Sequence, residues 1–387
     1  MSNLADNISN EAPVFHFIKD FSFNHGPSRV INNIIYDNKN ENNYIISFSP
    51  FNEKLVNENL KVFSPKAKGW VYQVIFIFKV YIELKKKANL VLVGHLIHGA
   101  LGVVLFKFIF PKKSKIVMVV HNVEDYFIKN GLKFFIARLI HSFTNFMSKL
   151  NISVSQDVKS VQEKNGLIKR QPKNIVIHNG VCQKDFYICN KSRKKIRKFY
   201  NFSEEDFVLL LTGAFIERKN FSFVLDLAEN LNTLCDSNLK ILLAGKGEDY
   251  DNLKKINNLK EVKKNIYFVG FQRNIMQFYN ACDLFCLPSK REGFGLVLIE
   301  AMMCGKPCLG ADVFGISEVL EKTYGGYKYS SQDKDRFLEK FSSIINSLNR
   351  KEIDPQKIRS NVIEKYSSEK MKRIYEDNFN KLRVIKS

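Results

Sequence analysis

Two glutamates and two glycines stand close together in the segment REGFGLVLIEAMMCGKPC, which runs from Arg291 to Cys308. Glu292 and Glu300 have seven residues between them, and Gly293-Phe294-Gly295 follows the first glutamate directly. The apolar run after these glycines predicts a helix, so they would stand at a helix N-terminus, where backbone N–H groups bind a diphosphate. Glu300 would lie about one and a half turns into this helix, where its carboxylate can accept two hydrogen bonds from a vicinal diol such as a ribose, while Glu292 would reach another part of the same ligand. The alternative, two solvated surface charges, is awkward for Glu300 because its neighbours in the sequence are apolar.

Basic residues and further glycines follow two other predicted strands. The strand at 207–211 ends in Thr212-Gly213, and Arg218 and Lys219 come shortly before a predicted helix. Cations beside a helix N-terminus form a phosphate site. The strand at 240–244 ends in Gly245-Lys246-Gly247, where glycines would let the backbone approach a ligand closely. Taken singly, either loop is also explained by an ordinary turn.

Strands and helices alternate along the chain in a pattern that predicts the α/β class. Short apolar runs typical of buried parallel strands cover residues 14–18, 44–48, 90–93, 116–120, 152–154 and 175–177, and then 207–211, 240–244, 266–269, 284–287 and 308–310. A charged stretch at 189–206 marks a domain boundary. We therefore expect two Rossmann-like doubly wound domains, 1–188 and 189–366, which face each other across a cleft and bind ligands at the carboxyl ends of their strands. Residues 367–387 would form a charged C-terminal helix.

The composition agrees with this class and narrows the choice of partner. A chain of 387 residues suggests about two domains, and a net charge of +21 favours an anionic partner such as phosphate groups, an acidic membrane surface or nucleic acid. A biased genome composition explains the surplus of lysine equally well. The seven cysteines predict buried thiols rather than disulfides, and their spacing favours no metal site.

Two apolar stretches raise the question of membrane contact. Residues 90–110 are long enough to span a bilayer, but His95, His98 and Lys107 would be costly at bilayer depth, so we predict a buried strand, a histidine-bearing loop and a helix from about Gly99. Residues 127–147 mix large apolar side chains with cations. Their helical spacing first predicts a core-packing helix, and the alternative is a helix that lies on an anionic bilayer near a lipid-linked acceptor. Because the first ten residues are polar, we expect a cytoplasmic protein, with peripheral contact to the inner face of the membrane as the alternative.

Taken together, these motifs resemble the retaining glycosyltransferases of family 4, which have the GT-B fold. The glutamates around Gly293-Phe294-Gly295 resemble the family signature, and several other stretches agree with the family in order: Asn24-His25-Gly26-Pro27-Ser28-Arg29, Val119-Val120-His121-Asn122-Val123-Glu124, Ile177-His178-Asn179-Gly180-Val181, Ala244-Gly245-Lys246-Gly247 and Gly315-Ile316-Ser317-Glu318-Val319. The resemblance covers most of the chain and is densest from 207 to 320. In such folds the C-terminal helix typically crosses back to the first domain.

The resemblance implies roles for named residues. Lys219, helped by Arg218, would neutralise the leaving diphosphate, and Glu300 would bind the ribose. Glu292 and the backbone of Gly293, Phe294 and Gly295 would hold the donor sugar and phosphate, with Gly245 close to the donor. His121 would face the donor sugar, unless it only caps a loop, and Gly26 would let the first domain close on the phosphates. Many relatives carry an arginine directly after the glycine of the Thr212-Gly213 strand end, where this chain has Ala214.

These observations predict a metal-independent glycosyltransferase that uses a UDP- or GDP-sugar. The acceptor would be a glycan or a lipid-linked glycan, and polysaccharide synthesis would be the setting. Fixed cations and a helix N-terminus stabilise a leaving diphosphate, and family likeness implies retention of the anomeric configuration. Two alternatives remain open: a basic protein that binds nucleic acid, for which aromatic stacking platforms are not evident, and a sugar-nucleotide epimerase of similar architecture.

Overall fold

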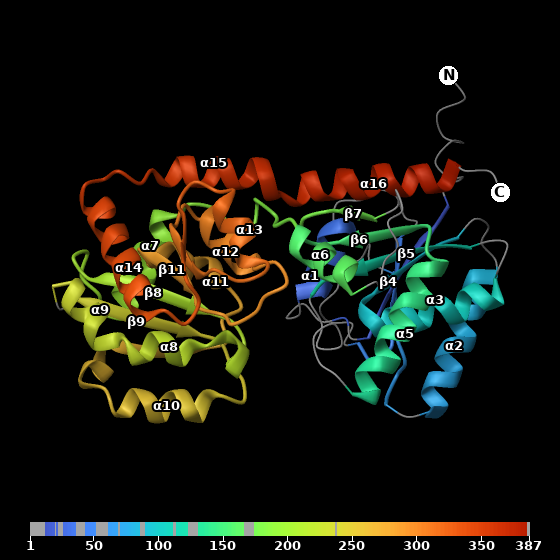
Figure 1. Cartoon of the computed structure of the whole chain (residues 1–387), viewed down its shortest axis with the longest axis horizontal. Coiled ribbons are helices and arrows are strands. Elements are labelled where there is room, and N and C mark those ends of the chain that lie inside the picture. Colours follow the sequence, from blue (N-terminus) through green and yellow to red (C-terminus); the bar gives the residue numbers. More distant parts are fainter. Residues whose placement is uncertain are drawn as a thin grey trace, which may run out of the picture. The chain divides into compact units, whose positions relative to one another are not determined.

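The computed structural model describes residues 12–19, 21, 26–35, 43–51, 61–68, 70–85, 90–110, 114–122, 131–165, 174–236 and 238–384. Expectations that concern residues 1–11, 24–25 and 123–130 lie outside these described residues. The chain divides into two compact units (Figure 1). Unit 1 comprises Met1–Gly180 and Ser368–Ser387, and unit 2 comprises Val181–Ser367. This division falls eight residues before the expected boundary at 188/189.

Among the described residues, unit 1 has a parallel sheet of seven strands in the order β3-β2-β1-β4-β5-β6-β7. Its strands are β1 (Val14–Ile18), β2 (Asn43–Ser47), β3 (Lys61–Phe63), β4 (Leu90–His95), β5 (Ser114–Val120), β6 (Leu150–Ser153) and β7 (Asn174–Val176). Its helices are α1 (Gly26–Ile35), α2 (Trp70–Lys85), α3 (Leu96–Ile109), α5 (Leu132–Met147), α6 (Gln156–Lys164) and α16 (Ser368–Val384). The strands are apolar almost throughout because helices cover both faces of a parallel sheet.

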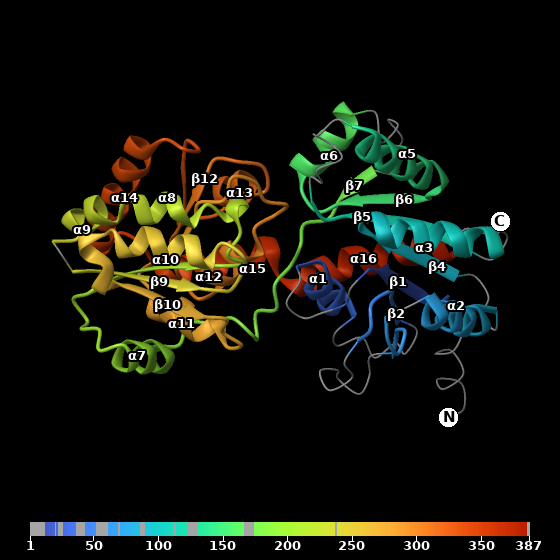
Figure 2. The same ribbon diagram turned by 90° about the horizontal axis from the view of Figure 1, so that it is seen from below.

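The helices of unit 1 divide between the two faces of its sheet. Phe76 of α2 and Phe106 of α3 pack on Phe15 and Phe17 of β1 in one core cluster. Helix α16 contacts α1 and β4, and its Phe379 lies against His16, the residue between those two phenylalanines. Successive side chains of a strand point to opposite faces, so α16 covers the opposite face. Figure 2 shows α3 between α5 and α2.

The junction of β4 and α3 differs from expectation. The predicted histidine-bearing loop is absent here, because β4 ends at His95 and α3 begins at the next residue, Leu96. This direct turn requires the left-handed conformation at Leu96, whose φ is 60°. It also requires a close approach of α3 to the sheet: a Cβ on Gly99 would lie 2.2 Å from the carbonyl oxygen of Phe17.

Unit 2 repeats the same strand order in its described residues, β10-β9-β8-β11-β12-β13, again all parallel. Its strands are β8 (Phe207–Thr212), β9 (Leu239–Ala244), β10 (Ile266–Gly270), β11 (Leu284–Leu287), β12 (Cys308–Ala311) and β13 (Gly326–Tyr329). Its helices are α7 (Asn190–Phe199), η2 (Glu217–Lys219), α8 (Phe221–Asp226), α9 (Ala228–Leu234), α10 (Tyr250–Asn258), η3 (Glu261–Asn265), α11 (Ile275–Ala281), α12 (Leu296–Met303), α13 (Ile316–Glu321), α14 (Lys334–Asn349) and α15 (Pro355–Tyr366). Both units are thus Rossmann-like, and in each the strand order reverses beside the first strand of the sheet, at β1/β4 and at β8/β11. Such switch points are where doubly wound sheets bind ligands.

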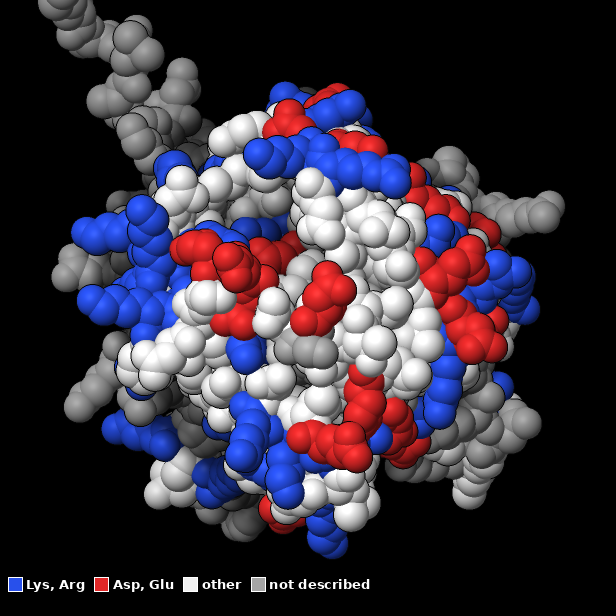
Figure 3. Space-filling model, turned by 90° about the vertical axis from the view of Figure 1, so that its left-hand side faces the viewer, with Lys and Arg blue, Asp and Glu red and all other residues white. Residues whose placement is uncertain are grey.

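One basic residue of α7, Arg197, helps to hold unit 2 together, whereas Lys191, Lys194, Lys195 and Lys198 of the same helix are exposed. Arg197 is buried and donates hydrogen bonds to the carbonyl oxygens of Ala281, Ser203 and Asp206. Its guanidinium also lies 3.3 Å from a carboxylate oxygen of Asp283. On the end face of unit 2 drawn in Figure 3, basic side chains are interspersed with acidic ones. Because charges of both signs are mixed on the face drawn in Figure 3, the nucleic-acid alternative gains no support from this face.

Candidate functional site

The candidate site of unit 2 begins where β8 ends. Gly213 has a φ of 143° and follows the last residue of the strand. A Cβ at this position would lie 3.3 Å from Cε of Lys219, so the lysine side chain lies over the strand end. The short helix η2 presents this side chain, and Asn220, in the left-handed conformation with a φ of 55°, turns the chain from η2 into α8. Lys219 is therefore held at the carboxyl end of the sheet, as its position in the sequence predicted.

The loop after β11 is bonded to this segment. The backbone N–H of Lys290 donates to the carbonyl oxygen of Arg218 at 2.9 Å, and the amide of Asn220 donates to the carbonyl oxygen of Pro288 at 3.2 Å. The Lys290 ammonium also pairs with Glu217 at 2.7 Å. These contacts bring together segments about seventy residues apart in the sequence, and they join the two loops on either side of the switch point.

Two cations and one carboxylate meet at this junction. Glu292 Oε2 lies 2.5 Å from Lys219 Nζ, and its Oε1 lies 3.5 Å from a guanidinium nitrogen of Arg218. Burial raises the pKa of Glu292, but Lys219, Arg218 and the hydrogen bonds from Lys219 and from the Gly293 backbone lower it more, so the net pKa lies below the usual 4.5. Glu292 is thus ionised at neutral pH, and the three side chains together carry one net positive charge.

The glycines after Glu292 shape the start of α12. Gly295 precedes the helix with a φ of 75°, in the left-handed region that favours glycine. Phe294 is buried against the ring of Tyr366 on α15, with 5.6 Å between ring centroids. The loop before α13 comes equally close, since a Cβ on Gly315 would lie 2.7 Å from the carbonyl oxygen of Glu292. The first N–H groups of a helix have no acceptor within the helix, so this end of α12 offers donors beside the Lys219–Glu292 pair.

Glu300 lies deeper in α12 and is almost fully buried. Its Oε2 accepts a hydrogen bond of 2.9 Å from the hydroxyl of Tyr279 on α11. That hydroxyl is in turn 3.3 Å from Oγ1 of Thr212, the last residue of β8. The solvated-surface interpretation of Glu300 is therefore wrong, and its carboxylate is connected to the same strand end over which Lys219 lies. Tyr279 was not predicted, because nothing in the sequence around it indicates that its hydroxyl binds a carboxylate.

Gly245 has a structural role that the sequence did not predict. A Cβ on Gly245 would lie 1.8 Å from the carbonyl oxygen of Gly213, and one on Gly247 would lie 2.2 Å from that of Phe215. The loop after β9 is also bonded to the loop after β8, with a 2.9 Å hydrogen bond from the Phe215 N–H to the Lys246 carbonyl. These glycines therefore let two loops of the protein approach each other, and a ligand contact is not needed to explain them.

The two expected site residues of the first half belong to unit 1. Gly26 is the first residue of α1. His121 directly follows β5, is buried, and has its Nε2 2.8 Å from Nδ1 of His95. The structure thus brings Arg218, Lys219 and Glu292 into contact within unit 2, connects Glu300 to the neighbouring strand end, and places His121 beside another histidine within unit 1.

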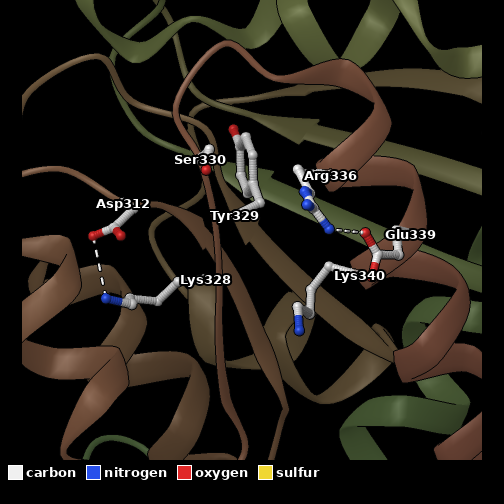
Figure 4. A pocket seen from close by; sticks show the side chains of 7 residues that line it. All are labelled: Asp312, Lys328, Tyr329, Ser330, Arg336, Glu339 and Lys340. Carbon is white, nitrogen blue, oxygen red and sulfur yellow. Dashed lines mark hydrogen bonds and ion pairs between the residues drawn. The ribbon is translucent and has the colours of Figure 1, made fainter.

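A surface hollow of about 200 Å³ lies elsewhere on unit 2. It is lined by Asp312, Lys328, Tyr329, Ser330, Arg336, Glu339 and Lys340 (Figure 4). Lys328 pairs with Asp312 at 3.2 Å, and Arg336 pairs with Glu339 at 2.8 Å. None of these seven residues was expected in the site, and their charges largely satisfy one another.

Comparison with known proteins identifies most of unit 2. Residues 192–364 match the family model described as glycosyl transferases group 1. This part of the chain is a group 1 glycosyltransferase domain. The group 1 domain contains all the expected site residues of unit 2, from Arg218 to Glu300.

Relatives and solved structures extend the similarity beyond the group 1 domain. The chain is 25% identical over 302 residues to N-acetyl-alpha-D-glucosaminyl L-malate synthase of Bacillus anthracis, covering 76% of this chain and 75% of that one. It is 23% identical over 279 residues to the N,N'-diacetylbacillosaminyl-diphospho-undecaprenol alpha-1,3-N-acetylgalactosaminyltransferase of Campylobacter jejuni, covering 69% and 68%. The crystal structure of Anabaena HepE in complex with UDP-glucose has the same fold, with a TM-score of 0.79 at 17% identity over 95% of this chain and 99% of that one. The fold on both sides of the group 1 domain is therefore that of two-domain glycosyltransferases.

Proposed function

We propose that the chain transfers a sugar from a UDP- or GDP-sugar to a glycan or lipid-linked glycan, with retention of anomeric configuration. The cluster of Arg218, Lys219 and Glu292 at the switch point carries this proposal. It combines net positive charge with the N-terminus of α12 inside a group 1 glycosyltransferase domain. HepE, whose fold is similar, was crystallised with UDP-glucose.

The chemistry of sugar transfer fits the charges of this cluster. Cleavage of the bond between sugar and phosphate leaves negative charge on the diphosphate and develops positive charge on the sugar. Lys219 and Arg218, with the N–H groups of α12, stabilise the first charge, and the ionised Glu292 stabilises the second. Because the leaving diphosphate can itself take the proton of the acceptor hydroxyl, no protonated carboxylic acid is required, in agreement with the lowered pKa of Glu292. Glu300 would bind the ribose, and His121 would donate a hydrogen bond to the sugar.

The cations of the cluster also suggest how the reaction proceeds without a metal. Arg218 and Lys219 supply the positive charge that a divalent ion otherwise supplies to a diphosphate. We therefore propose that activity persists in the presence of EDTA. A loss of turnover in EDTA that returns with added Mg²⁺ or Mn²⁺ would contradict this part of the proposal.

Three helices of unit 1 suggest where the acceptor is met. Fourteen of the twenty-one exposed large apolar side chains in the described part of the chain lie on α2, α3 and α5. On α2 they recur at Tyr72, Ile75, Phe78 and Ile82; on α3 at Leu101, Leu105, Phe108 and Ile109; and on α5 at Leu132, Phe135, Ile136, Leu139, Phe143 and Phe146. We call these fourteen side chains the apolar face.

Helix α5 shows the pattern most clearly. Its fully buried side chains are the polar His141, Thr144 and Asn145, whereas its exposed stripe is apolar. The expectation of a core-packing helix at 127–147 is therefore wrong for the six exposed apolar residues of α5, because the sheet is already covered by α2 and α3. The rings of Phe108 and Phe143 stack with 6.5 Å between centroids, which makes the stripes of α3 and α5 continuous.

We propose that the apolar face lies on an anionic lipid bilayer. The sequences of the three helices contain five basic residues and one acidic residue, Glu83, a balance that suits anionic headgroups. Within the described residues, no helix is long and apolar enough to cross a bilayer, so the contact would be interfacial. The Campylobacter relative, whose name specifies a diphospho-undecaprenol acceptor, supports a lipid-linked acceptor for this chain.

A panel of sugar nucleotides tests the proposed reaction. Purified protein is incubated with UDP- and GDP-sugars, release of UDP or GDP is measured, and the anomeric configuration of any transferred sugar is read by proton NMR. We expect one or a few donors to be hydrolysed or used, with retention. Thermal stabilisation by an oligonucleotide and by neither UDP nor GDP would favour the nucleic-acid alternative instead.

A further inference from the structure

Three histidines form a diagonal row across the sheet of unit 1. In the strand register, His16 of β1 is paired with Val93 of β4, and His95 of β4 is paired with Val119 of β5. His95 and His121 each stand two residues beyond these partners, so their side chains project from the same face as that of His16. The row starts inside β1 and ends just past β5, and it crosses the β1/β4 switch point of unit 1.

The three imidazoles are hydrogen-bonded in series. His16 Nδ1 lies 3.0 Å from His95 Nε2, and His95 Nδ1 lies 2.8 Å from His121 Nε2. All three residues are buried. At the two ends, His16 Nε2 and His121 Nδ1 have no hydrogen-bond partner among the described residues. We call this series the histidine chain.

The central member is held by a strained turn. Leu96, directly after His95, adopts a φ of 60°, a conformation that costs a bulky side chain on the order of 1 kcal/mol or more. The turn sends the backbone from β4 straight into α3, which lies close on β1 because Gly99 has no Cβ. A strained residue that fixes one imidazole between two others is typical of a functional position.

Burial keeps all three histidines of the histidine chain neutral. It lowers the pKa of His16 and of His121 to about 3. The pKa of His95 is also lowered well below its usual value, mainly by burial and in addition by His121 and His16. A neutral imidazole carries one N–H and one lone pair, so each link joins one donor to one acceptor. Only two arrangements satisfy both links: all three histidines are protonated at Nδ1, or all three are protonated at Nε2.

The ends of the chain distinguish the two arrangements. Each arrangement buries one N–H that has no acceptor among the described residues: protonation at Nε2 throughout leaves that of His16, beside Phe379, and protonation at Nδ1 throughout leaves that of His121. Buried N–H groups without an acceptor are rare, so we expect the unpaired N–H to lie at the end of the series where a ligand can supply the acceptor. Protonation at Nδ1 throughout instead places the free N–H on His121, at the carboxyl end of β5, where a substrate oxygen can accept it.

We propose that His16 and His95 are positioning residues that hold His121 as the neutral tautomer protonated at Nδ1. In this form His121 presents an N–H as a hydrogen-bond donor to an oxygen of the sugar substrate. The identity of the substrate rests on the proposed function, whereas the tautomer is a property of unit 1 alone. Neither His16 nor His95 touches substrate in this proposal, and both act through the hydrogen bonds of the chain.

Nitrogen-15 NMR of the full-length protein tests the proposal directly. The protein is labelled at its seven histidines, and the ring nitrogens are assigned by comparison with single variants. We expect His16, His95 and His121 to be protonated at Nδ1 and unprotonated at Nε2 near pH 7. A wild-type His121 protonated at Nε2 overturns the proposal without any need for a variant.

Variants test whether the chain sets this state. His16→Leu removes the far donor, and we expect the Nδ1 populations of both His95 and His121 to fall, although His16 lies two links away from His121. His141→Leu is the matched control, because His141 is buried in the same unit but is bonded to Gln162 instead. It should leave the His121 signals unchanged. Unchanged His121 signals in both His16→Leu and His95→Leu would overturn the proposal.

Kinetics then separate this inference from the proposed function. With a donor found in the sugar-nucleotide panel, we expect His95→Leu to lower kcat/KM about tenfold, the worth of one hydrogen bond, and His141→Leu to leave it unchanged. If the tautomers behave as described but no donor is used, the proposed function fails and the histidine chain stands. If a donor is used equally well by His95→Leu and wild type, the role of the chain in positioning His121 is refuted.

Discussion

In the proposed reaction, the Lys219–Glu292 pair would change partners when a nucleotide sugar binds. In the structure the two side chains are 2.5 Å apart, and Arg218 lies on the other oxygen of the carboxylate. A diphosphate that takes over Lys219 leaves Glu292 beside the sugar, with Arg218 as its remaining cation. The pair would therefore supply both charges that the proposed transfer requires, and in the free protein neither charge is buried without a partner.

Lys219→Ala tests this exchange of partners. We expect kcat to fall about 100-fold, because one fixed stabiliser of the leaving diphosphate is lost, with a smaller change in donor KM. Lys290→Ala is the control, since this lysine lies in the same junction but pairs with the exposed Glu217, and we expect it to retain wild-type kcat. Equal rates for Lys219→Ala and Lys290→Ala would remove Lys219 from the mechanism.

Glu300 is expected to act on binding rather than on turnover. Glu300→Ala removes the proposed ribose acceptor, so donor KM should rise about tenfold or more, as for the loss of a hydrogen bond to a charged group, while kcat changes little. Tyr279→Phe removes only the hydroxyl that bonds Oε2 and should raise KM less. Steady-state kinetics with varied donor measure both, and Glu339→Ala, a surface carboxylate paired with Arg336, serves as the control. A rise in KM for Glu339→Ala of the same size would show that the effect is not specific.

At this scale the sequence predicted the charged residues of the site better than their partners. Glu292 and Lys219 were predicted from their places after strands, because the carboxyl ends of parallel strands meet at one edge of a sheet. Tyr279 could not be predicted, since its hydroxyl reaches Glu300 only through the packing of α11 on α12. Gly245 was assigned to a ligand because a glycine that admits a ligand and one that admits a neighbouring loop look the same in a sequence.

At the scale of elements, the sequence left the helices of unit 1 undecided. An apolar stripe at helical spacing predicts a buried face, and the spacing alone does not say whether the sheet or a lipid covers that face. The outcome depended on α2 and α3, whose buried stripes already fill the sheet and leave α5 to bury polar residues. The early start of α3 was likewise hidden, because it depends on the contact of Gly99 with β1.

The apolar face can be tested by placing negative charge on α5. Phe135→Asp combined with Phe146→Asp places two anions among exposed apolar side chains, and we expect binding to liposomes that contain anionic lipid to fall at least tenfold. Loss of buried apolar area and repulsion from anionic headgroups act in the same direction. Liposome co-sedimentation measures the effect, with neutral liposomes as a lipid control.

The protein control carries two substitutions of the same kind, an exposed apolar residue to Asp, on unit 2. Phe199 and Leu259 are 74% and 86% exposed, so Phe199→Asp with Leu259→Asp adds the same two negative charges and also removes two exposed apolar side chains. We expect this variant to bind liposomes as wild type does. If the wild-type protein does not bind anionic liposomes but forms dimers, and the α5 variant does not form them, the apolar face contacts a second copy of the chain instead of lipid.

At the scale of the whole molecule, the last helix belongs with the first unit. Met371, Tyr375, Phe379 and Leu382 form the buried stripe of α16, and Lys115 of β5 donates a hydrogen bond to the carbonyl of Leu382 at 2.6 Å. The sequence predicted a charged C-terminal helix from its composition, and its place on unit 1 only from family likeness. The buried stripe of α16 covers the sheet face that carries His16, His95 and His121. The burial of these three histidines therefore depends on the packing of α16.

Buried neutral histidines also give unit 1 a specific response to acid. His16, His121 and His141 have pKa values of about 3, 3 and 4, lowered by burial, against about 6.5 in an unfolded chain. Below pH 6.5 the unfolded state therefore binds more protons than the folded state, so stability falls as the pH falls and is insensitive to these groups above about pH 7.5. Three such groups correspond to a loss of about 4 kcal/mol for each pH unit between about pH 5.5 and 4.5.

Denaturant unfolding at several pH values measures this slope. We expect the free energy of unfolding to be flat from pH 8 to 7.5 and to fall increasingly steeply below pH 6.5.

His141→Leu removes one titrating group outside the histidine chain and should reduce the slope by about 1.4 kcal/mol per pH unit. If the slope of the variant equals that of wild type, His141 is protonated in the folded protein and the burial argument does not apply to it. The same comparison with His16→Leu extends the test to the histidine chain, where removal of one neutral imidazole should reduce the slope by at least as much.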